Sequence, residues 1–157
     1  MRLGSRRALN CAGKRVMADA YNLERFVDAQ RSVYDRVLRE LRAGRKESHW
    51  MWFVFPQIAG LGRSSTAVFY AVSSLDEAKA YLAHPILGAR LRESADAVLA
   101  AEGRSARQIF GPIDEMKFRS SMTLFMKAAP DEPLFGECLR MFFGGAADPA
   151  TLEKLSH

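Results

Sequence analysis

Cysteine and histidine are both scarce in this chain of 157 residues, which has two of the former and three of the latter. Cys11 lies in a basic N-terminal segment and Cys138 in a predicted helix, so we expect no structural disulfide and a reducing, cytoplasmic location. His49, His84 and His157 are too far apart in the sequence to supply the closely spaced ligands of a zinc site. We therefore predict that the protein uses no metal and no cofactor.

Long apolar runs are also absent. No stretch approaches the roughly 18 consecutive apolar residues of a membrane-spanning helix, and residues 1–16 lack the apolar core of a signal peptide. We expect no membrane partner. The signatures of phosphate loops, dinucleotide folds, nucleophile elbows and zinc proteases are missing too. This excludes enzymes defined by one local motif, but an active site assembled from distant residues stays open.

The net charge of +5 comes from one end of the chain. Of the 23 basic residues, five lie in residues 1–16, and the remaining 18 equal the 18 acidic residues in number. Residues 1–16 have no regular periodicity, so we interpret them as a disordered or non-native extension, with a targeting peptide as the alternative. Residues 17–157 are expected to form a single helical domain. Because that part carries no net charge, we do not expect a nucleic-acid partner.

Apolar residues recur at helical spacing through most of the chain, and the strands that an α/β fold needs are missing. We therefore predict an all-α fold. Helix starts are expected at Asn22, Ser64 or Ser65, Ser74, Pro85, Asp114, Pro133 and Asp148, with a short turn from Ser105 to Pro112. The first of these helices is predicted to run through Leu41 and to present Arg25 on a solvated face.

Residues 49–58 are almost entirely apolar or aromatic and contain Pro56. We predict an extended or irregular segment that passes through the core. Its His49, Trp50, Trp52 and Gln57 are the side-chain types of an aromatic-walled pocket with polar tips, which suits a planar or sugar-containing ligand. The alternative is a dense core segment without a binding role.

Two further segments are candidates for binding an anion. Glycines and hydroxyls around Arg63 lead into a predicted helix, where backbone N–H groups favour a negative group, although such turns are also common as plain helix caps. Asp114, Lys117 and Ser121 share one face of a predicted helix and could act in acid–base chemistry or hold a phosphate. A surface ion pair would give the same residue pattern.

Several motifs occur in a fixed order along the chain: residues 48–58 (SHWMWFVFPQI), 60–62 (GLG), 81–85 (YLAHP), 87–88 (LG), 90–91 (RL), 110–111 (FG), Asp114, Lys117 and 120–125 (SSMTLF). Together they resemble a bacterial and fungal family of domains of unknown function, over about residues 21–156. The resemblance implies an all-helical fold and no established activity. Some members carry the label calpastatin, which implies calpain inhibition by disordered repeats. We reject that function because this chain is apolar and unrepeated.

Two functional hypotheses follow. In the first, a small phosphorylated or ADP-ribose-like ligand binds among residues of three segments, either with or without catalysis. The candidate residues are His49, Trp50, Trp52, Gln57, Arg63, Lys117, Arg119 and Ser120. In the second, the chain is a non-catalytic module that binds a protein partner through exposed aromatic and apolar residues.

Overall fold

The computed structural model describes residues 19–101 and 103–156, and the regular secondary structure in these ranges is helical. The predicted all-α class is therefore confirmed. In chain order the helices are α1 (Glu24–Arg31), α2 (Tyr34–Arg42), α3 (Met51–Val54), α4 (Ser65–Phe69), α5 (Leu75–Ala83), α6 (Leu87–Leu99), α7 (Ala106–Ala128), α8 (Pro133–Phe143) and α9 (Pro149–Leu155). None of these described helices is long and apolar enough to cross a membrane.

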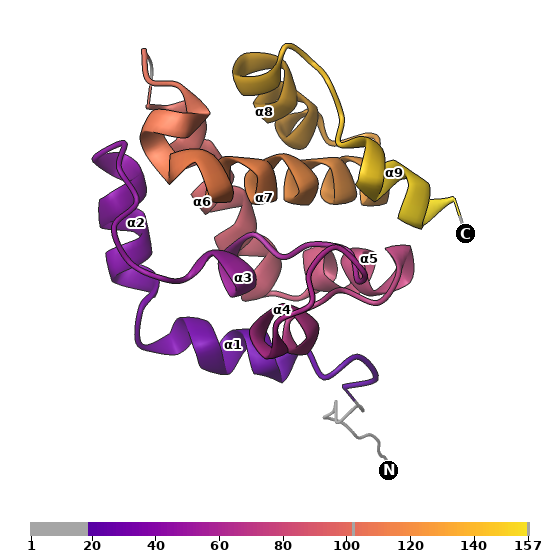
Figure 1. The fold of residues 1–157 in the computed structure, drawn as a ribbon. Coiled ribbons are helices and arrows are strands. Elements are labelled where there is room, and N and C mark those ends of the chain that lie inside the picture. The colour runs from indigo at the N-terminus through magenta and orange to yellow at the C-terminus, as the bar shows by residue number, and fades with distance from the viewer. Residues whose placement is uncertain (1–18, 102, 157) are drawn as a thin grey trace.

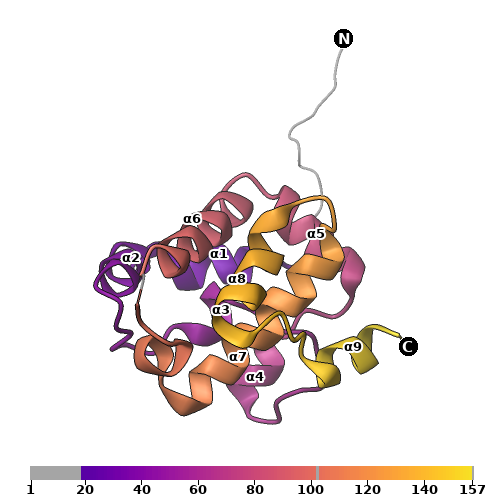
Figure 2. The same cartoon turned by 90° about the horizontal axis from the view of Figure 1, so that it is seen from above.

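Helix α7 lies at the centre of the arrangement (Figures 1 and 2). It packs against α5, α8 and α9, while α6 packs against α2, α5 and α8. Phe118 of α7 is fully buried and contacts the rings of Phe55 and Phe110, with centroid distances of 5.0 and 4.7 Å. This aromatic core fixes the segment around Phe55 against α7.

The first predicted helix is divided into α1 and α2, because Val33 leaves the helical conformation at φ −123°. The division lets α1 pack against α3 while α2 packs against α6. The predicted cap at Asn22 is also wrong. Leu23 is the N-cap residue of α1, and Asp19 accepts hydrogen bonds from the N–H groups of Leu23 and Glu24, at 2.8 and 2.9 Å. Asn22 instead has φ 54°, a left-handed conformation that asparagine tolerates.

Asp114 does not cap a helix as predicted, because it lies within α7. That helix begins one residue after Ser105, whose side chain forms a reciprocal capping box with Gln108. The predicted turn near Pro112 is a kink at Gly111, where φ is 86° and ψ is 166°. Only glycine adopts such angles readily, so the kink has a local cause.

The other helix starts agree largely with the sequence. Ser64, Ser74 and Asp148 each accept a backbone hydrogen bond at the start of a helix, and Pro133 opens α8. Helix α6, however, begins at Leu87, two residues after the position predicted from Pro85.

The aromatic segment contains the single helical turn α3 and is irregular after it. Its end is joined to the segment before α5 by an isolated parallel bridge between Ile58 and Val72. Residues 1–16, including Cys11, and His157 lie outside the described residues.

Candidate ligand-binding site

A pocket of about 330 Å³ lies next to the aromatic segment. Trp52 and Gln57 form part of its wall, followed by residues 59–62 of the adjoining loop. Most of the remaining wall is formed by α4, through Ala67 and Val68, and by Tyr70 just after it. Two of the residues that the sequence predicted for a binding site are thus brought together at one pocket.

The turn of α3 gives its two tryptophans different surroundings. Trp50 is only 1% exposed and lies in the core, where its indole N–H donates to Oε1 of Glu40 at 2.9 Å. Trp52 is half-buried and lines the pocket. Trp50 is therefore a core residue, and Trp52 is the tryptophan that lines the pocket.

Gly62 permits the loop to approach Trp52 closely. A Cβ atom at this position would lie 2.7 Å from Cβ of Ala67 and 3.4 Å from Cη2 of Trp52. The first distance is well below the optimum of about 3.5–4.0 Å between carbon atoms. A glycine is therefore needed for this wall of the pocket.

Gln57 is a largely buried amide at the pocket wall, and its Nε2 atom is unpaired within the described chain. It is 9% exposed, and its Nε2 atom has no hydrogen-bond partner among the residues that the structure describes. Gln30 is the matched contrast, since its buried Nε2 donates to the carbonyl of Phe53 at 2.7 Å and lies 3.1 Å from the hydroxyl of Tyr81. Buried polar groups are normally paired, so the amide of Gln57 calls for an explanation.

The segment opposite Gln57 is held by backbone hydrogen bonds. The N–H of Val72 donates to the carbonyl of Gln57 at 2.9 Å, and the N–H of Ala59 donates to the carbonyl of Val72 at 2.8 Å. These bonds join the two chain segments that form the walls between α3 and α5.

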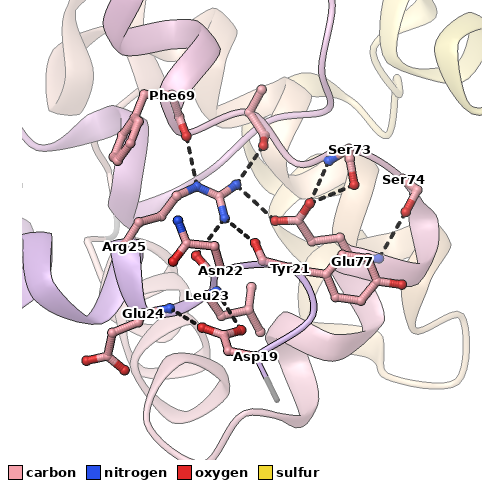
Figure 3. Close-up of polar contacts among 11 residues, drawn as sticks. Asp19, Tyr21, Asn22, Leu23, Glu24, Arg25, Phe69, Ser73, Ser74 and Glu77 are labelled. Atoms are coloured by element: carbon pink, nitrogen blue, oxygen red, sulfur yellow. Dashed lines mark hydrogen bonds and ion pairs between the residues drawn. The ribbon is translucent and has the colours of Figure 1, made fainter.

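Arg25 holds the chain between α4 and α5, which contributes Tyr70, Ala71 and Ser73 to the pocket, and Figure 3 draws its contacts. Its guanidinium donates to the carbonyls of Phe69 and Ala71, each at 2.8 Å, and to Oε2 of Glu77 at 3.0 Å. It also donates to the carbonyls of Tyr21 and Asn22, at 2.6 and 2.8 Å. These five contacts match the five N–H groups of arginine.

The Arg25 side chain is 10% exposed and that of Glu77 is 3% exposed, so the predicted solvated position of Arg25 is wrong. Glu77 also accepts hydrogen bonds from the N–H and the hydroxyl of Ser73, at 2.9 and 2.8 Å (Figure 3). The pair is saturated with internal partners and positions the pocket wall.

Lys117 lies over the indole of Trp52, with Nζ 4.2 Å from the ring centroid. Its ammonium donates to Oδ1 of Asp114 at 3.1 Å, and Lys46 pairs with Oδ2 of the same carboxylate at 2.9 Å. Burial alone would raise the pKa of Asp114, but the two ammonium groups outweigh it and keep that pKa below its ordinary value. Two cations thus share one anion next to Trp52.

Glu40 holds residues 47–50, which lead from Lys46 into the aromatic segment. Its carboxylate accepts hydrogen bonds from the N–H groups of Glu47 and Ser48, at 2.8 and 3.0 Å, from the indole of Trp50 and from the Ser48 hydroxyl. Burial would raise the pKa of Glu40, yet these hydrogen bonds together lower it to about 2. Glu40 therefore remains an anion that fixes the start of the aromatic segment.

The remaining predicted residues do not line the pocket. His49 and Arg63 are exposed, although Arg63 directly follows the pocket residue Gly62. Arg119 donates to the carbonyls of Ala146 and Ala147, each at 2.9 Å.

The hydroxyl of Ser120 lies 3.0 Å from Oδ2 of Asp148, which caps α9. Arg119 and Ser120 thus hold the C-terminal segment in place.

Sequence reasoning missed Tyr70 in the pocket, the Arg25–Glu77 pair behind it and Lys46 beside Asp114. An aromatic residue at the end of the predicted short helix was a weak signal for Tyr70. Arg25 and Glu77 carried no local signal, because they meet across 52 positions of sequence.

Comparison with known proteins identifies the family of the chain. A family model described as "Protein of unknown function (DUF1810)" matches residues 20–155. The crystal structure of the conserved hypothetical protein Rv1873 from Mycobacterium tuberculosis is similar, with a TM-score of 0.87 and 51% sequence identity. The match covers 88% of this chain and 99% of that one. No curated protein matches significantly.

Proposed function

Because the chain belongs to the family described as protein of unknown function (DUF1810), we propose its function from the pocket itself: it binds a small phosphorylated ligand of the ADP-ribose class beside Trp52. The observation that carries it is the unpaired, buried amide of Gln57 in the wall of that pocket.

The shape and lining of the pocket support a ligand with a planar ring. Its volume of about 330 Å³ is at the lower end of the roughly 300–1,000 Å³ typical of small-molecule sites. Trp52 and Tyr70 offer aromatic surface, and aromatic pairs are worth about 0.5–1.5 kcal/mol beyond the area they bury. Nε2 of Gln57 is closed to solvent in this structure, so an acceptor on the ring edge would pair with it once the side chain turns the amide towards the pocket, which would remove the cost of leaving it unpaired.

The charges next to Trp52 support an anionic group on the same ligand. Lys46 and Lys117 bring two positive charges to the single carboxylate of Asp114, and Lys117 is the one that lies over the Trp52 ring. Arg63 adds a further exposed cation directly after the pocket loop. The ammonium of Lys117 and the guanidinium of Arg63 would attract a phosphate group on the ligand.

The test is thermal unfolding of the full chain with ADP-ribose, nucleotides, sugar phosphates and inorganic phosphate. A ligand present at 100 times its Kd stabilises the native state by about 2.7 kcal/mol, which raises the unfolding midpoint. We expect this rise with ADP-ribose or a related phosphorylated compound. It should be lost in Trp52→Ala and kept in Met141→Ala, which truncates an exposed apolar residue of α8. A rise that survives Trp52→Ala would contradict the proposed place of binding.

A protein-interaction module is the second candidate, because several large apolar side chains are exposed. Ile113 and Met116 are 71% and 57% exposed and lie one helical turn apart on α7. If this second function is correct, a protein partner that binds the wild-type chain should not bind the Ile113→Ser, Met116→Ser double variant. Stabilisation by ligands would be unchanged in that variant, which separates the two functions.

A further inference from the structure

A second hollow of about 320 Å³ adjoins the pocket at Trp52. The two share Ile58, Ala59 and Ser73 as wall residues, so one ligand could extend from the first into the second. The first is lined mainly by apolar and aromatic residues. The second receives Ser74 and Asp76 from the start of α5 and Lys154 from α9.

Lys154 lies at the junction of the two hollows. A Cβ atom on Gly60, which lines the first hollow, would lie 3.0 Å from Cε and 3.2 Å from Nζ of Lys154. The ammonium has no carboxylate within ion-pair distance in residues 19–101 and 103–156. A cation at this place is available to an anionic group of a ligand.

The backbone of α9, which carries the exposed Lys154, is anchored at its start. Asp148 caps this helix by accepting hydrogen bonds from the N–H and the hydroxyl of Thr151, at 3.1 and 2.6 Å. The N–H of Asp148 in turn donates to the hydroxyl of Thr123 on α7 at 2.9 Å. Ser120 contacts the same carboxylate, so part of the predicted binding set acts here by holding α9.

Asp76 gives the second hollow an acceptor. Its carboxylate is exposed and has no cationic partner among the described residues, in contrast to Glu77 beside it. A carboxylate next to a phosphate-binding cation is suited to the hydroxyl groups of a ribose, as in nucleotide-binding folds where an acid accepts from the 2′-hydroxyl. The first hollow therefore offers aromatic surface for a ring, and the second offers polar groups for a sugar phosphate.

We infer that the ligand is a ribonucleotide that occupies both hollows. Its base lies against Trp52 and near Gln57, its phosphate binds Lys154, and its ribose hydroxyls donate to Asp76. This inference rests on the proposed function and narrows it, because it adds Lys154 and Asp76 as residues that determine specificity.

The test is calorimetric titration of the full chain with adenosine, guanosine, cytidine and uridine and with their 5′-monophosphates. A charge-assisted hydrogen bond is worth about 1.5–3 kcal/mol, so we expect the phosphate to tighten binding of the preferred nucleoside roughly ten- to hundredfold. Lys154→Met should remove that gain in affinity and leave the affinity for the nucleoside unchanged. Lys127→Met, at an exposed lysine of α7, should keep both affinities.

Asp76 is tested by comparing the preferred ribonucleotide with its 2′-deoxy form. The wild-type chain should prefer the ribonucleotide several-fold, and Asp76→Asn should reduce that preference. Circular dichroism melting shows whether each variant is folded before its affinity is interpreted.

The outcomes separate the inference from the proposed function. A phosphate gain that survives Lys154→Met, or a nucleoside that gains nothing from its phosphate, would overturn the inference while binding at Trp52 stands. If ADP-ribose and sugar phosphates bind in a Trp52-dependent way but nucleosides and nucleotides do not, the inference is again overturned alone. If no member of either panel binds, both fail.

Discussion

The ammonium of Lys117 lies 4.2 Å from the centroid of the Trp52 indole, and the same group donates to Asp114. Cation–π contacts are worth about 0.5–1 kcal/mol at exposed sites and about 2 kcal/mol when desolvated. Since the Lys117 side chain is 21% exposed, Lys117→Met should lower the free energy of unfolding by about 1 kcal/mol. Urea unfolding measures this, with Lys127→Met as a control that should change little. Equal effects of the two substitutions would mean that the contact with Trp52 contributes nothing.

Replacing Arg25 should lower the free energy of unfolding far more than replacing Arg31, an arginine of the same helix whose ion pairs are exposed. Arg25→Met leaves Glu77 charged and buried, and breaking a buried pair costs about 3–5 kcal/mol. Arg31 pairs with Glu24 and Asp28 while 64% exposed, so Arg31→Met should cost less than about 1 kcal/mol. Denaturant unfolding of both variants gives the comparison. Similar losses of unfolding free energy in the two variants would contradict the structural role that we assign to Arg25 at the pocket wall.

Glu40 predicts a loss of stability in acid. Its pKa is lowered from 4.5 to about 2 in the folded chain, so the unfolded chain binds the proton more readily. The stabilisation is present above about pH 4.5 and is lost as the pH falls from there towards 2. Glu40→Gln should flatten this part of the curve of unfolding free energy against pH. If the variant loses the same unfolding free energy over this acidic range, other carboxylates cause the loss.

The local features of the fold could be predicted from the sequence. Ser64, Ser74 and Asp148 cap helices through contacts within three residues, so their spacing alone is informative. The break at Val33 could not be predicted in this way, because it depends on two helices packing against different partners. The same holds for Asp114, whose carboxylate meets Lys46 from a distant part of the chain.

The candidate site was predictable in part for a similar reason. Trp52 and Gln57 are close in sequence and unusual in composition, which drew attention to their segment. The pattern could not distinguish Trp52 at the pocket from Trp50 in the core, because that depends on where Glu40 and α7 lie. Lys154 gave no signal, since only the folded chain brings it to Gly60.

The two buried glutamines should respond in opposite ways to the same substitution. Gln30→Leu leaves the carbonyl of Phe53 and the hydroxyl of Tyr81 without this partner, which should cost about 1–3 kcal/mol. Gln57→Leu removes an amide whose Nε2 has no partner in the described chain, so it should be neutral or stabilising. Thermal unfolding of both variants without ligand tests this. Comparable destabilisation by both would mean that Gln57 has a structural partner.

The most direct test of ligand recognition is the unfolding midpoint of Gln57→Leu with and without ADP-ribose, measured beside the wild-type chain. We predict that the wild-type midpoint rises with ADP-ribose, while that of Gln57→Leu starts as high or higher and rises less. An equal rise in the two proteins would contradict recognition through Gln57. If the wild-type midpoint rises with neither ADP-ribose nor any other phosphorylated compound of the panel, the proposed binding itself is contradicted.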